Sequence, residues 1–386
     1  MKSKLSLIFA LLPLFLFVSA DSQVTLGDRI KGYMSLYDCI GVSVVVVKDG
    51  SVCYSNCIGY NPDYKDSTAR KPIKRGDIYW IASVSKTFVA TAIMQLREKK
   101  KLSLDDDVNK YLDFKVQNPY FPETPITIKM LLSHRSSLND HKYEYSFNQI
   151  NPHTNPDYRL LYNKYQPGSD YHYCNLGYNI LGAIIENVSG QRFDDYIKQN
   201  ILSPLGLIGD FNVSRLDPAK LVWSYFYNKK TKSFEHDHTI YTYFEKEIDN
   251  YKLGYTTPVF SPAGGMKLSA DALAQYMIMH MNEGKYNGKR IINRKSESLM
   301  RMIQTPETHY ALSFRHYNNE AYIVIKDKEL IGQTGGSHGI HSSMIFDPQK
   351  KYGFVVICNG CKSNYPDGAD LNNKIINLCY RYLIND

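Results

Sequence analysis

The chain has 386 residues, of which 43% are hydrophobic, and it carries a formal net charge of +8. This length and apolar content suit a soluble globular protein with one large core or two lobes that share a cleft, and they exclude a disordered chain. The positive excess is moderate and forms no basic run longer than residues 99–101, so nothing in the composition indicates nucleic acid as a partner.

Residues 1–20 have the layout of a cleavable secretory signal. Two lysines precede an apolar run over residues 5–18, and small residues lead up to Ala20 and Asp21. An uncleaved anchor is the alternative, although the run is short for spanning a bilayer. We therefore expect a secreted or periplasmic chain of residues 21–386, without stable membrane insertion after cleavage.

The first regular element after the signal is a β-hairpin. Residues 40–47 and 51–58 are rich in β-branched residues, and Asp49-Gly50 between them is a typical two-residue hairpin turn. One end of a sheet is expected here.

A serine and a lysine one helical turn apart follow the hairpin. Ser83 and Lys86 stand where an apolar helical pattern begins, over residues 83–100. Residues three apart share a helix face, and the unpaired NH groups of a first helical turn stabilise negative charge. A Ser-x-x-Lys match arises by chance about once or twice in a chain of this size, so the pair needs partners elsewhere in the chain.

The middle of the chain predicts a mostly helical lobe. Helical spacing of apolar residues recurs over 127–133, 176–187 and 271–282, with Thr127 and Ser269 as N-caps. Long polar and aromatic loops separate these segments.

Two more motifs stand downstream of the Ser-Lys pair. Tyr173-Cys174-Asn175 follows a Pro-Gly turn and precedes an apolar helix, and we interpret Cys174 as a small filler between two functional residues. Gln333-Thr334-Gly335-Gly336 is interpreted as a turn, and its glycines could serve only as a strand bend. Strands are expected after it, over residues 342–346 and 352–358, followed by a helical tail over 371–383.

Seven cysteines in an exported chain allow disulfides and leave at least one thiol unpaired. Cys39, Cys53 and Cys57 lie on or beside the first hairpin, and Cys358 and Cys361 lie on or after the last strand. Bridges between these groups are possible, but the sequence leaves their connectivity open.

In this order, the three motifs resemble those of the serine β-lactamase and penicillin-binding protein family. The resemblance is to the class C branch, which also contains DD-peptidases, D-aminopeptidases and esterases, and it spans residues 40–359. It implies an α/β (α+β) fold of the β-lactamase/transpeptidase type, in which an antiparallel sheet flanked by helices adjoins a helical lobe. No cofactor and no metal are implied. Further matching segments are Leu102-Ser103-Leu104-Asp105-Asp106, Leu131-Leu132-Ser133-His134, Tyr165-Gln166-Pro167-Gly168 and Pro262-Ala263-Gly264-Gly265-Met266.

The resemblance also implies roles for single residues. Ser83 would attack a carbonyl and form an acyl-enzyme, activated by Lys86 and Tyr173. An ammonium beside a phenol lowers the phenol's pKa, so Lys86 could make Tyr173 a base. Asn175 would hold the acyl group's amide or orient Lys86.

The last motif would build the substrate side of the site. The backbone NH groups of Ser83 and Gly336 would form an oxyanion hole, and Thr334, beside Gly335, would line the cleft. Family members acting on penicillins usually carry lysine, and some carry histidine, where this chain has Gln333. Glutamine offers only neutral hydrogen bonds, so efficient β-lactamase action is less expected.

His338 or His341 could replace the lost cationic contact at the cleft edge. A loop histidine that faces water is the simpler interpretation, since histidine is mostly neutral at pH 7. Tyrosines before the tyrosine motif, among them Tyr158, Tyr162 and Tyr171, could line a broad apolar cleft or reflect the tyrosine-rich composition.

We therefore predict a secreted serine hydrolase that acts through acyl-Ser83 on esters, amides or D-amino-acid peptides. Cleavage of β-lactams or peptidoglycan stems is the second hypothesis, and acyl transfer to a small alcohol or amine is the third. A non-catalytic binding or sensor protein of the same fold is the contrasting class. The intact set of Ser83, Lys86 and Tyr173 argues against it.

Overall fold

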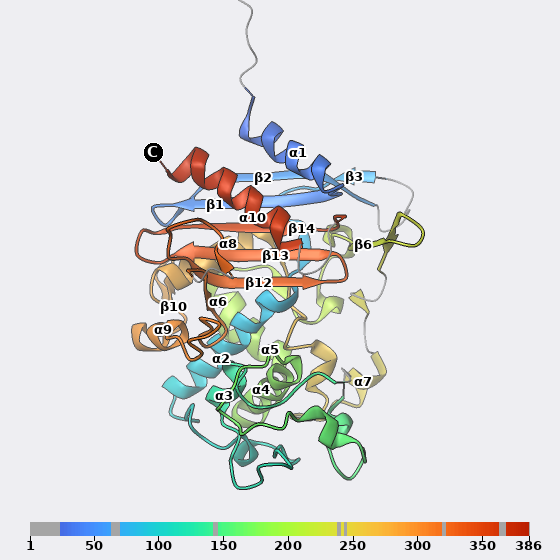
Figure 1. Ribbon diagram of the computed structural model, residues 1–386, viewed down its shortest axis with the longest axis vertical. Coiled ribbons are helices and arrows are strands. Elements are labelled where there is room, and N and C mark those ends of the chain that lie inside the picture. The colour runs from blue at the N-terminus through green and yellow to red at the C-terminus, as the bar shows by residue number, and fades with distance from the viewer. Residues whose placement is uncertain are drawn as a thin grey trace, which may run out of the picture.

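Both ends of the chain contribute strands to one seven-stranded sheet (Figure 1). The computed structural model describes residues 24–62, 70–141, 146–237, 241–242, 245–318, 322–362 and 368–385, so the predicted signal lies outside it. The strand order is β11-β12-β13-β14-β1-β2-β3, and every neighbouring pair is antiparallel, which confirms the predicted sheet. The strands are β1 (Gly41–Lys48), β2 (Ser51–Pro62), β3 (Arg70–Pro72), β11 (Arg315–His316), β12 (Ile331–Ser337), β13 (Ile340–Asp347) and β14 (Tyr352–Cys358).

The β1–β2 hairpin forms as predicted. Asp49 and Gly50 have φ values of 53° and 72°, the left-handed pair that a tight two-residue turn needs. Strand β1 is buried along nearly its whole length, and its valines alternate between two core clusters. The sheet is therefore covered on both faces.

Helices from the two ends of the chain cover one face, and a helix from the middle covers the other. Helices α1 (Leu26–Leu36) and α10 (Gly368–Cys379) pack together on the first face, where Ile30 and Ile375 join the valine side chains of β1. Helix α8 (Ala270–Met281) lies against β1, β13 and β14 on the opposite face. We call this layered part the sheet lobe.

The remaining helices form a helical lobe beside β12 (Figure 1). Helix α2 packs against α4 at its centre, and Thr127 and Ser269 cap α3 and α8 as predicted. Of the helices in the described ranges, none is long and apolar enough to cross a bilayer. The lobe contains α2 (Lys86–Glu98), α3 (Ile128–Leu132), α4 (Asn175–Ser189), α5 (Phe193–Ile197), α6 (Ser203–Leu205), α7 (Glu245–Asp249) and α9 (Arg294–Arg301).

The remaining short strands form three small sheets outside the seven-stranded sheet. A three-stranded sheet has the order β4-β8-β5, and two further pairs are β6–β7 and β9–β10. The strands are β4 (Ile78–Trp80), β5 (Gly209–Asp210), β6 (Tyr225–Asn228), β7 (Ser233–His236), β8 (Lys267–Ser269), β9 (Lys285–Tyr286) and β10 (Lys289–Arg290).

Two local predictions were wrong. The segment Gln333-Thr334-Gly335-Gly336 is not a turn but lies inside β12, and the turn comes later, at His338 and Gly339, whose φ values are 49° and 82°. Glycines mimic a turn signal here, although the strand needs them for close packing. The helix expected from Ser83 begins at Lys86, because Ser83 lies in a 3-10 turn over Ala82–Ser85.

Cys39, from the first group of cysteines, meets the second group at one end of the sheet lobe. Cys39 lies between α1 and β1, Cys358 ends β14, and their sulfur atoms are 3.2 Å apart. All seven cysteines are free thiols. The Cys358 thiol contacts both Cys39 and Cys361, so the sulfur positions allow a bridge from Cys358 to either of them.

Candidate active site

Ser83, the predicted nucleophile, lies in a strained turn at the junction of the two lobes. Ala82, the residue before Ser83, has a φ of 45°, a left-handed conformation that costs on the order of 1 kcal/mol for a residue other than glycine. Two hydrogen bonds hold the turn in place: the Ile81 NH donates to the Met266 carbonyl at 3.0 Å, and the Met266 NH donates to the Ser85 hydroxyl at 3.0 Å. This turn therefore fixes where the Ser83 side chain begins.

Strand β12 closes against the same turn. A Cβ placed on Gly335 would lie 2.5 Å from the Ile81 carbonyl oxygen and 2.9 Å from the Ser83 nitrogen. Only glycine fits at such distances, so Gly335 allows the strand to approach Ser83. The predicted first and third motifs are thus in contact.

The three predicted catalytic side chains form one hydrogen-bonded set. The Tyr173 hydroxyl donates to Ser83 Oγ at 2.7 Å, and Lys86 Nζ donates to the same oxygen at 3.1 Å. Lys86 Nζ also lies 4.8 Å from the centre of the Tyr173 ring. Once either group has lost a proton of its own, it lies within hydrogen-bonding distance to accept the proton of Ser83.

Lys86 is fully buried, and burial lowers its pKa to about 7. Besides Ser83 Oγ, its nitrogen contacts Asn175 Oδ1 at 2.8 Å and the Ala263 carbonyl oxygen at 2.6 Å. Those two oxygens can only accept, whereas a serine hydroxyl can also donate. The neutral amine can therefore keep both carbonyl contacts and accept the proton of Ser83.

Asp140 fixes the amide of Asn175. The Asp140 carboxylate accepts hydrogen bonds from the backbone NH groups of Asn175 and Leu176. It also accepts a hydrogen bond from the side-chain amide of Asn175, whose Nδ2 lies 2.8 Å away. The other end of that amide, Oδ1, is thereby turned toward Lys86. Both ends of the amide are engaged, which favours the lysine-orienting role among the two predicted for Asn175.

Asp140 was not identified from the sequence. It lies 35 residues before Asn175 and contacts it only through the fold, at the N-terminus of α4. A carboxylate at a helix N-terminus also suits the helix dipole. The only sequence signal would have been an acidic residue shortly after the matching Leu-Leu-x-His segment.

Cys174 and His134 are buried residues that pack beside Tyr173. Cys174 is buried, and burial raises its thiol pKa well above the usual value, in keeping with a filler rather than a nucleophile. His134 Nδ1 accepts from the Cys174 NH at 3.1 Å, and its ring centre lies 4.3 Å from that of Tyr173. Burial holds the pKa of His134 well below 6.5, so the ring is neutral and acts as a positioning group.

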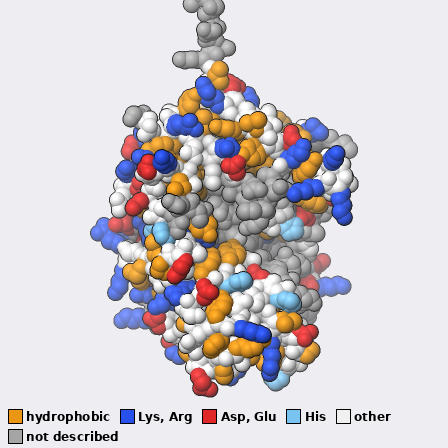
Figure 2. All heavy atoms as spheres, viewed as in Figure 1, with side chains coloured by type: hydrophobic (Ala, Val, Ile, Leu, Met, Phe, Trp, Pro, Cys, Tyr) orange, Lys and Arg blue, Asp and Glu red, His pale blue; other side chains and the backbone are white. Residues whose placement is uncertain are grey.

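A cavity of about 590 Å³ opens at Ser83. In the view of Figure 2 the surface is hollowed near its middle, and hydrophobic side chains gather there. The cavity is lined by Ser83, Tyr171, Tyr173, Tyr310, Arg315, Tyr317, Tyr322, Ile323, Val324, Gln333, Thr334, Gly335, Gly336, His341, Ser342, Ser343, Asn372 and Asn373. All four residues of the predicted third motif are in this wall, and so is Tyr171, whereas Tyr158 and Tyr162 pack in or against the core.

Of the three polar residues considered for the cleft edge, Gln333 and His341 line the cavity and His338 lies in a turn outside it. Gln333 is buried, and its amide donates to the Tyr310 hydroxyl at 2.9 Å and accepts from the Thr334 NH at 3.1 Å. His338 lies in the β12–β13 turn, where its ring contacts Asp237, and it is not among the described residues that line the cavity. His341, opposite Gly336 on β13, does line it.

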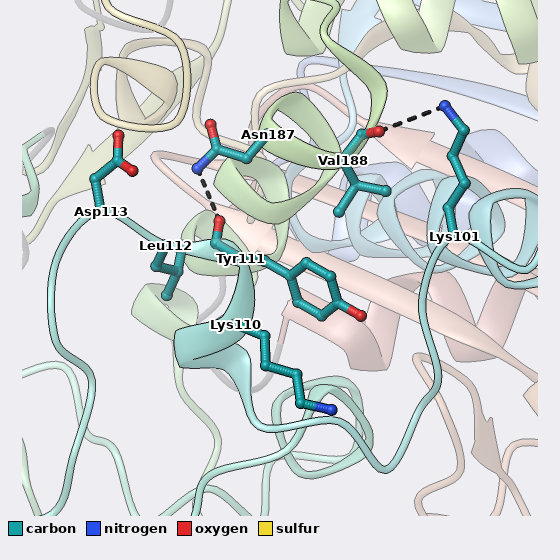
Figure 3. Close-up of a pocket in the computed structure, with 7 residues that line it drawn as sticks. All are labelled: Lys101, Lys110, Tyr111, Leu112, Asp113, Asn187 and Val188. Carbon is teal, nitrogen blue, oxygen red and sulfur yellow. Dashed lines mark hydrogen bonds between the residues drawn. The ribbon is translucent and has the colours of Figure 1, made fainter.

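A second hollow, of about 640 Å³, lies away from these residues (Figure 3). Its polar contacts are structural: Asn187 Nδ2 donates to the Tyr111 carbonyl oxygen at 2.8 Å, and Lys101 Nζ lies 3.5 Å from the Val188 carbonyl oxygen. The described residues around it include no serine, cysteine or histidine. Size alone therefore does not identify the functional site. The lining is Lys101, Lys110, Tyr111, Leu112, Asp113, Asn187 and Val188.

Comparison with known proteins gives one family across the chain. The Beta-lactamase family model matches residues 26–375. Protein flp of Staphylococcus aureus (strain MRSA252) is 27% identical over 372 residues, which cover 92% of this chain and 67% of that protein.

Solved structures share the fold. The octameric penicillin-binding protein homologue from Pyrococcus abyssi superposes with a TM-score of 0.72 at 26% identity, covering 93% of this chain and 76% of the other. EstCE1, described as a hydrolase with promiscuous acyltransferase activity, superposes with a TM-score of 0.70 at 22% identity, covering 91% and 98%. The predicted fold of the β-lactamase/transpeptidase type is thereby confirmed.

Proposed function

Because the chain belongs to the beta-lactamase family of serine hydrolases, we propose that it is an active hydrolase that acylates Ser83 and passes the acyl group to water. The observation that carries this proposal is the pair of contacts at Ser83 Oγ, 2.7 Å from the Tyr173 hydroxyl and 3.1 Å from Lys86 Nζ. A binding protein of this fold would have no need to keep all three groups in hydrogen-bonding distance.

Acylation begins with loss of the serine proton. Lys86, whose pKa is about 7, accepts this proton directly or through the Tyr173 hydroxyl, while Ser83 Oγ forms a bond to the substrate carbonyl carbon. The carbonyl electron pair moves onto oxygen, where the backbone NH groups of Ser83 and Gly336 stabilise it. Collapse of this intermediate expels the alcohol or amine, which takes the proton, and leaves acyl-Ser83.

Water then attacks the acyl-enzyme by the same route. Its proton goes to Lys86 or Tyr173, its oxygen binds the acyl carbon, and Ser83 Oγ leaves and regains a proton. Each oxyanion donor of this kind typically contributes about 10² to 10³ in rate. The groups that serve acylation therefore serve deacylation as well.

The proposed substrates are esters, amides or D-amino-acid peptides. Gln333 is neutral and its amide already bonds to Tyr310, so this position supplies no charge to a β-lactam or a peptidoglycan stem. Cleavage of those substrates remains the second candidate within the same chemistry.

Acyl transfer to an alcohol or amine is a further candidate. The cavity of about 590 Å³ leaves room for an acceptor beside a small acyl group. The fold is shared with EstCE1, a hydrolase with promiscuous acyltransferase activity, which makes added alcohol a useful arm of the assay.

We also propose export of the protein, on the strength of the sequence of residues 1–20. Expression of the full chain in a bacterial host, followed by N-terminal sequencing of the periplasmic fraction, tests this directly. A mature N-terminus at Asp21 supports export, whereas retention of the chain in the cytoplasm contradicts it.

The test of function combines labelling and turnover. Purified residues 21–386 are incubated with a fluorophosphonate, a penicillin or an activated ester, and the intact mass is measured while ester hydrolysis is followed. We expect one label per chain and ester turnover in the wild type, and neither in Ser83→Ala. Ser203→Ala, at an exposed serine in α6, is the matched control and should behave as wild type.

Each result discriminates between the candidate functions. A penicillin adduct that clears with time indicates β-lactamase action, and a new ester formed from added alcohol indicates acyl transfer. Stoichiometric labelling without turnover of any ester indicates the binding or sensor class. Labelling that survives in Ser83→Ala would contradict the assignment of the nucleophile.

A further inference from the structure

Three cysteines that the proposed hydrolase reaction does not use have their thiols in contact. The sulfur of Cys358, the last residue of β14, lies 3.2 Å from that of Cys39, and the Cys358 thiol also shares a hydrogen bond with the thiol of Cys361. We call these three residues the thiol cluster. Cys358 can form a bridge with only one of its two neighbours at a time, so one disulfide could be exchanged between two positions.

The sequence of the thiol cluster also indicates redox chemistry. Cys358-Asn359-Gly360-Cys361 is a Cys-x-x-Cys motif, a spacing found in redox-active pairs of cysteines. The chain contains no second Cys-x-x-Cys motif, which a zinc site of four cysteines would use. The motif therefore favours disulfide chemistry over a four-cysteine metal site.

Backbone hydrogen bonds keep the thiol cluster together. The segment before β1 lies beside the segment after β14: the Ile40 NH donates to the Gly360 carbonyl oxygen at 2.9 Å, and the Lys362 NH donates to the Tyr37 carbonyl oxygen at 2.7 Å. Cys39 lies between the two bonds on one segment, and the second cysteine of the motif lies between them on the other. The three thiols therefore stay close to one another whichever two of them are bonded.

The three thiols differ in their access to solvent. Cys39 is partly exposed, whereas Cys358 and Cys361 are 0% and 3% exposed. A disulfide dissolved in water therefore meets Cys39 first. Transfer from Cys39 to the buried pair then takes place within the protein, where the reacting groups are already in contact.

The surroundings of Cys361 suit it to act last. Its contact with the Cys358 thiol is the main cause that raises the pKa of Cys361, and burial adds to it, whereas a hydrogen bond with His341 lowers this pKa. Once Cys358 is part of a bridge, its thiol is gone and the contact with His341 remains. The imidazole of His341 can then accept the Cys361 proton, which favours the thiolate needed for attack.

We propose that the thiol cluster is a thiol–disulfide exchange site, which accepts a disulfide from a small molecule at Cys39 and passes it to the Cys358–Cys361 pair. This redox site is separate from the Ser83 chemistry and does not depend on the proposed hydrolase function. The co-reactant is a low-molecular-weight disulfide, RSSR.

The exchange proceeds in three displacements. Cys39 attacks RSSR, forms a mixed disulfide with one SR group and releases the first RSH. Cys358 attacks the sulfur of Cys39 and releases the second RSH, which leaves a Cys39–Cys358 bridge. Cys361 attacks the sulfur of Cys358, and Cys39 leaves as a thiol. In each step the attacking thiol loses a proton and the leaving sulfur gains one, so two cysteine thiols are oxidised and one RSSR is reduced to two RSH.

The first test follows the reduced wild-type protein in oxidised glutathione over time. Samples are blocked with N-ethylmaleimide and digested with trypsin without reduction. A Cys39–Cys358 bridge links residues 32–48 to residues 352–362, whereas a Cys358–Cys361 bridge lies inside the second peptide, which then loses two hydrogens and takes up no label. We expect the linked peptides to appear first and to give way to the bridge inside residues 352–362.

The second test removes single thiols. In Cys39→Ser the Cys358–Cys361 bridge should form at least about tenfold more slowly, because the partly exposed thiol that meets the oxidant is gone. Cys361→Ser should stop at the Cys39–Cys358 bridge. Cys53→Ser, at an exposed thiol near the other end of the β1–β2 hairpin, is the matched control and should keep the wild-type rate. Circular dichroism of the reduced variants shows whether each is folded.

The outcomes are independent of ester hydrolysis. A wild type that forms no Cys358–Cys361 bridge, or that keeps the Cys39–Cys358 bridge as its final product, overturns this inference. An equal rate of Cys358–Cys361 bridging in Cys39→Ser also overturns it, because the disulfide would then not enter at Cys39. Failure to hydrolyse any ester would overturn the proposed function and leave this inference standing.

Discussion

The pKa of Lys86 leads to a specific prediction about how activity depends on pH. Lys86 is buried beside Ser83, and burial lowers its pKa from the value usual for lysine to about 7. The group is therefore an ammonium below pH 7, where it cannot accept a proton, and a free amine above pH 7, where it can. Activity should rise as the pH increases through 7.

The size of the effect follows from the titration of one group. With a pKa of about 7, the fraction of neutral Lys86 is about 0.1 at pH 6 and about 0.9 at pH 8, so kcat/KM should rise about tenfold between these values and level off above them. An unperturbed lysine, with a pKa of about 10.4, would instead give a continuous rise throughout this range.

The assay is the initial rate of hydrolysis of a neutral activated ester from pH 5.5 to 9, at substrate concentrations well below KM. Under these conditions kcat/KM reports the groups of the free enzyme. The rate with Ser83→Ala gives the background at each pH. A profile that is flat from pH 6 to 8, or that falls as the pH rises through 7, would refute the role of Lys86 as the base and would favour a protonated Lys86 that acts on Tyr173.

Four further results are expected. Tyr173→Phe should lower kcat/KM by about 10² to 10⁴ and slow fluorophosphonate labelling, because it removes the hydroxyl 2.7 Å from Ser83 Oγ. Asp140→Asn should move the midpoint of the pH profile to lower pH, since the Asp140 charge raises the pKa of Lys86; an unchanged midpoint would contradict this coupling. Lys86→Met should raise the free energy of unfolding by a few kcal/mol below pH 7, because it removes a buried charge. The gain should be smaller at higher pH, where Lys86 loses its proton in the folded protein but keeps it in the unfolded chain up to about pH 10.4. Urea denaturation at pH 6 and pH 9 measures both values. Oxidised glutathione should join Cys39 and Cys358 with loss of two hydrogens, seen as a linked peptide in a non-reducing digest that is missing after Cys39→Ser.

Local signals predicted those parts of the molecule that depend on neighbouring residues. Asp49-Gly50 predicted the hairpin turn, which forms as expected. The three-residue spacing of Ser83 and Lys86 predicted that their side chains would lie on one face, and they are in hydrogen-bonding contact. The order of the three motifs then predicted the fold. The helix start at Ser83 was misplaced because the left-handed Ala82 has no signature in sequence.

Other parts of the site depend on tertiary contacts that no local pattern encodes. Asp140 reaches Asn175 across a long loop, and Arg315 belongs to a strand of two residues. The sequence positions of these two residues do not show what they contact in the fold. Likewise, the choice between His338 and His341 depends on the β12–β13 register, which places His341 opposite Gly336 and His338 in the turn.

The topology of the sheet has a consequence for how the protein folds. Val44 of β1 pairs with Val356 of β14, so the central pairing of the sheet joins segments from opposite ends of the chain. Proteins with such distant pairings fold slowly, because loop closure must precede the contacts that stabilise it. During synthesis the apolar edge of the β1–β2 hairpin has no neighbour until the last strands have been made, a state prone to aggregation. Ser83 likewise meets Gly335 only when β12 docks, so we expect the ability to form an acyl-enzyme to appear at the end of folding, together with native structure.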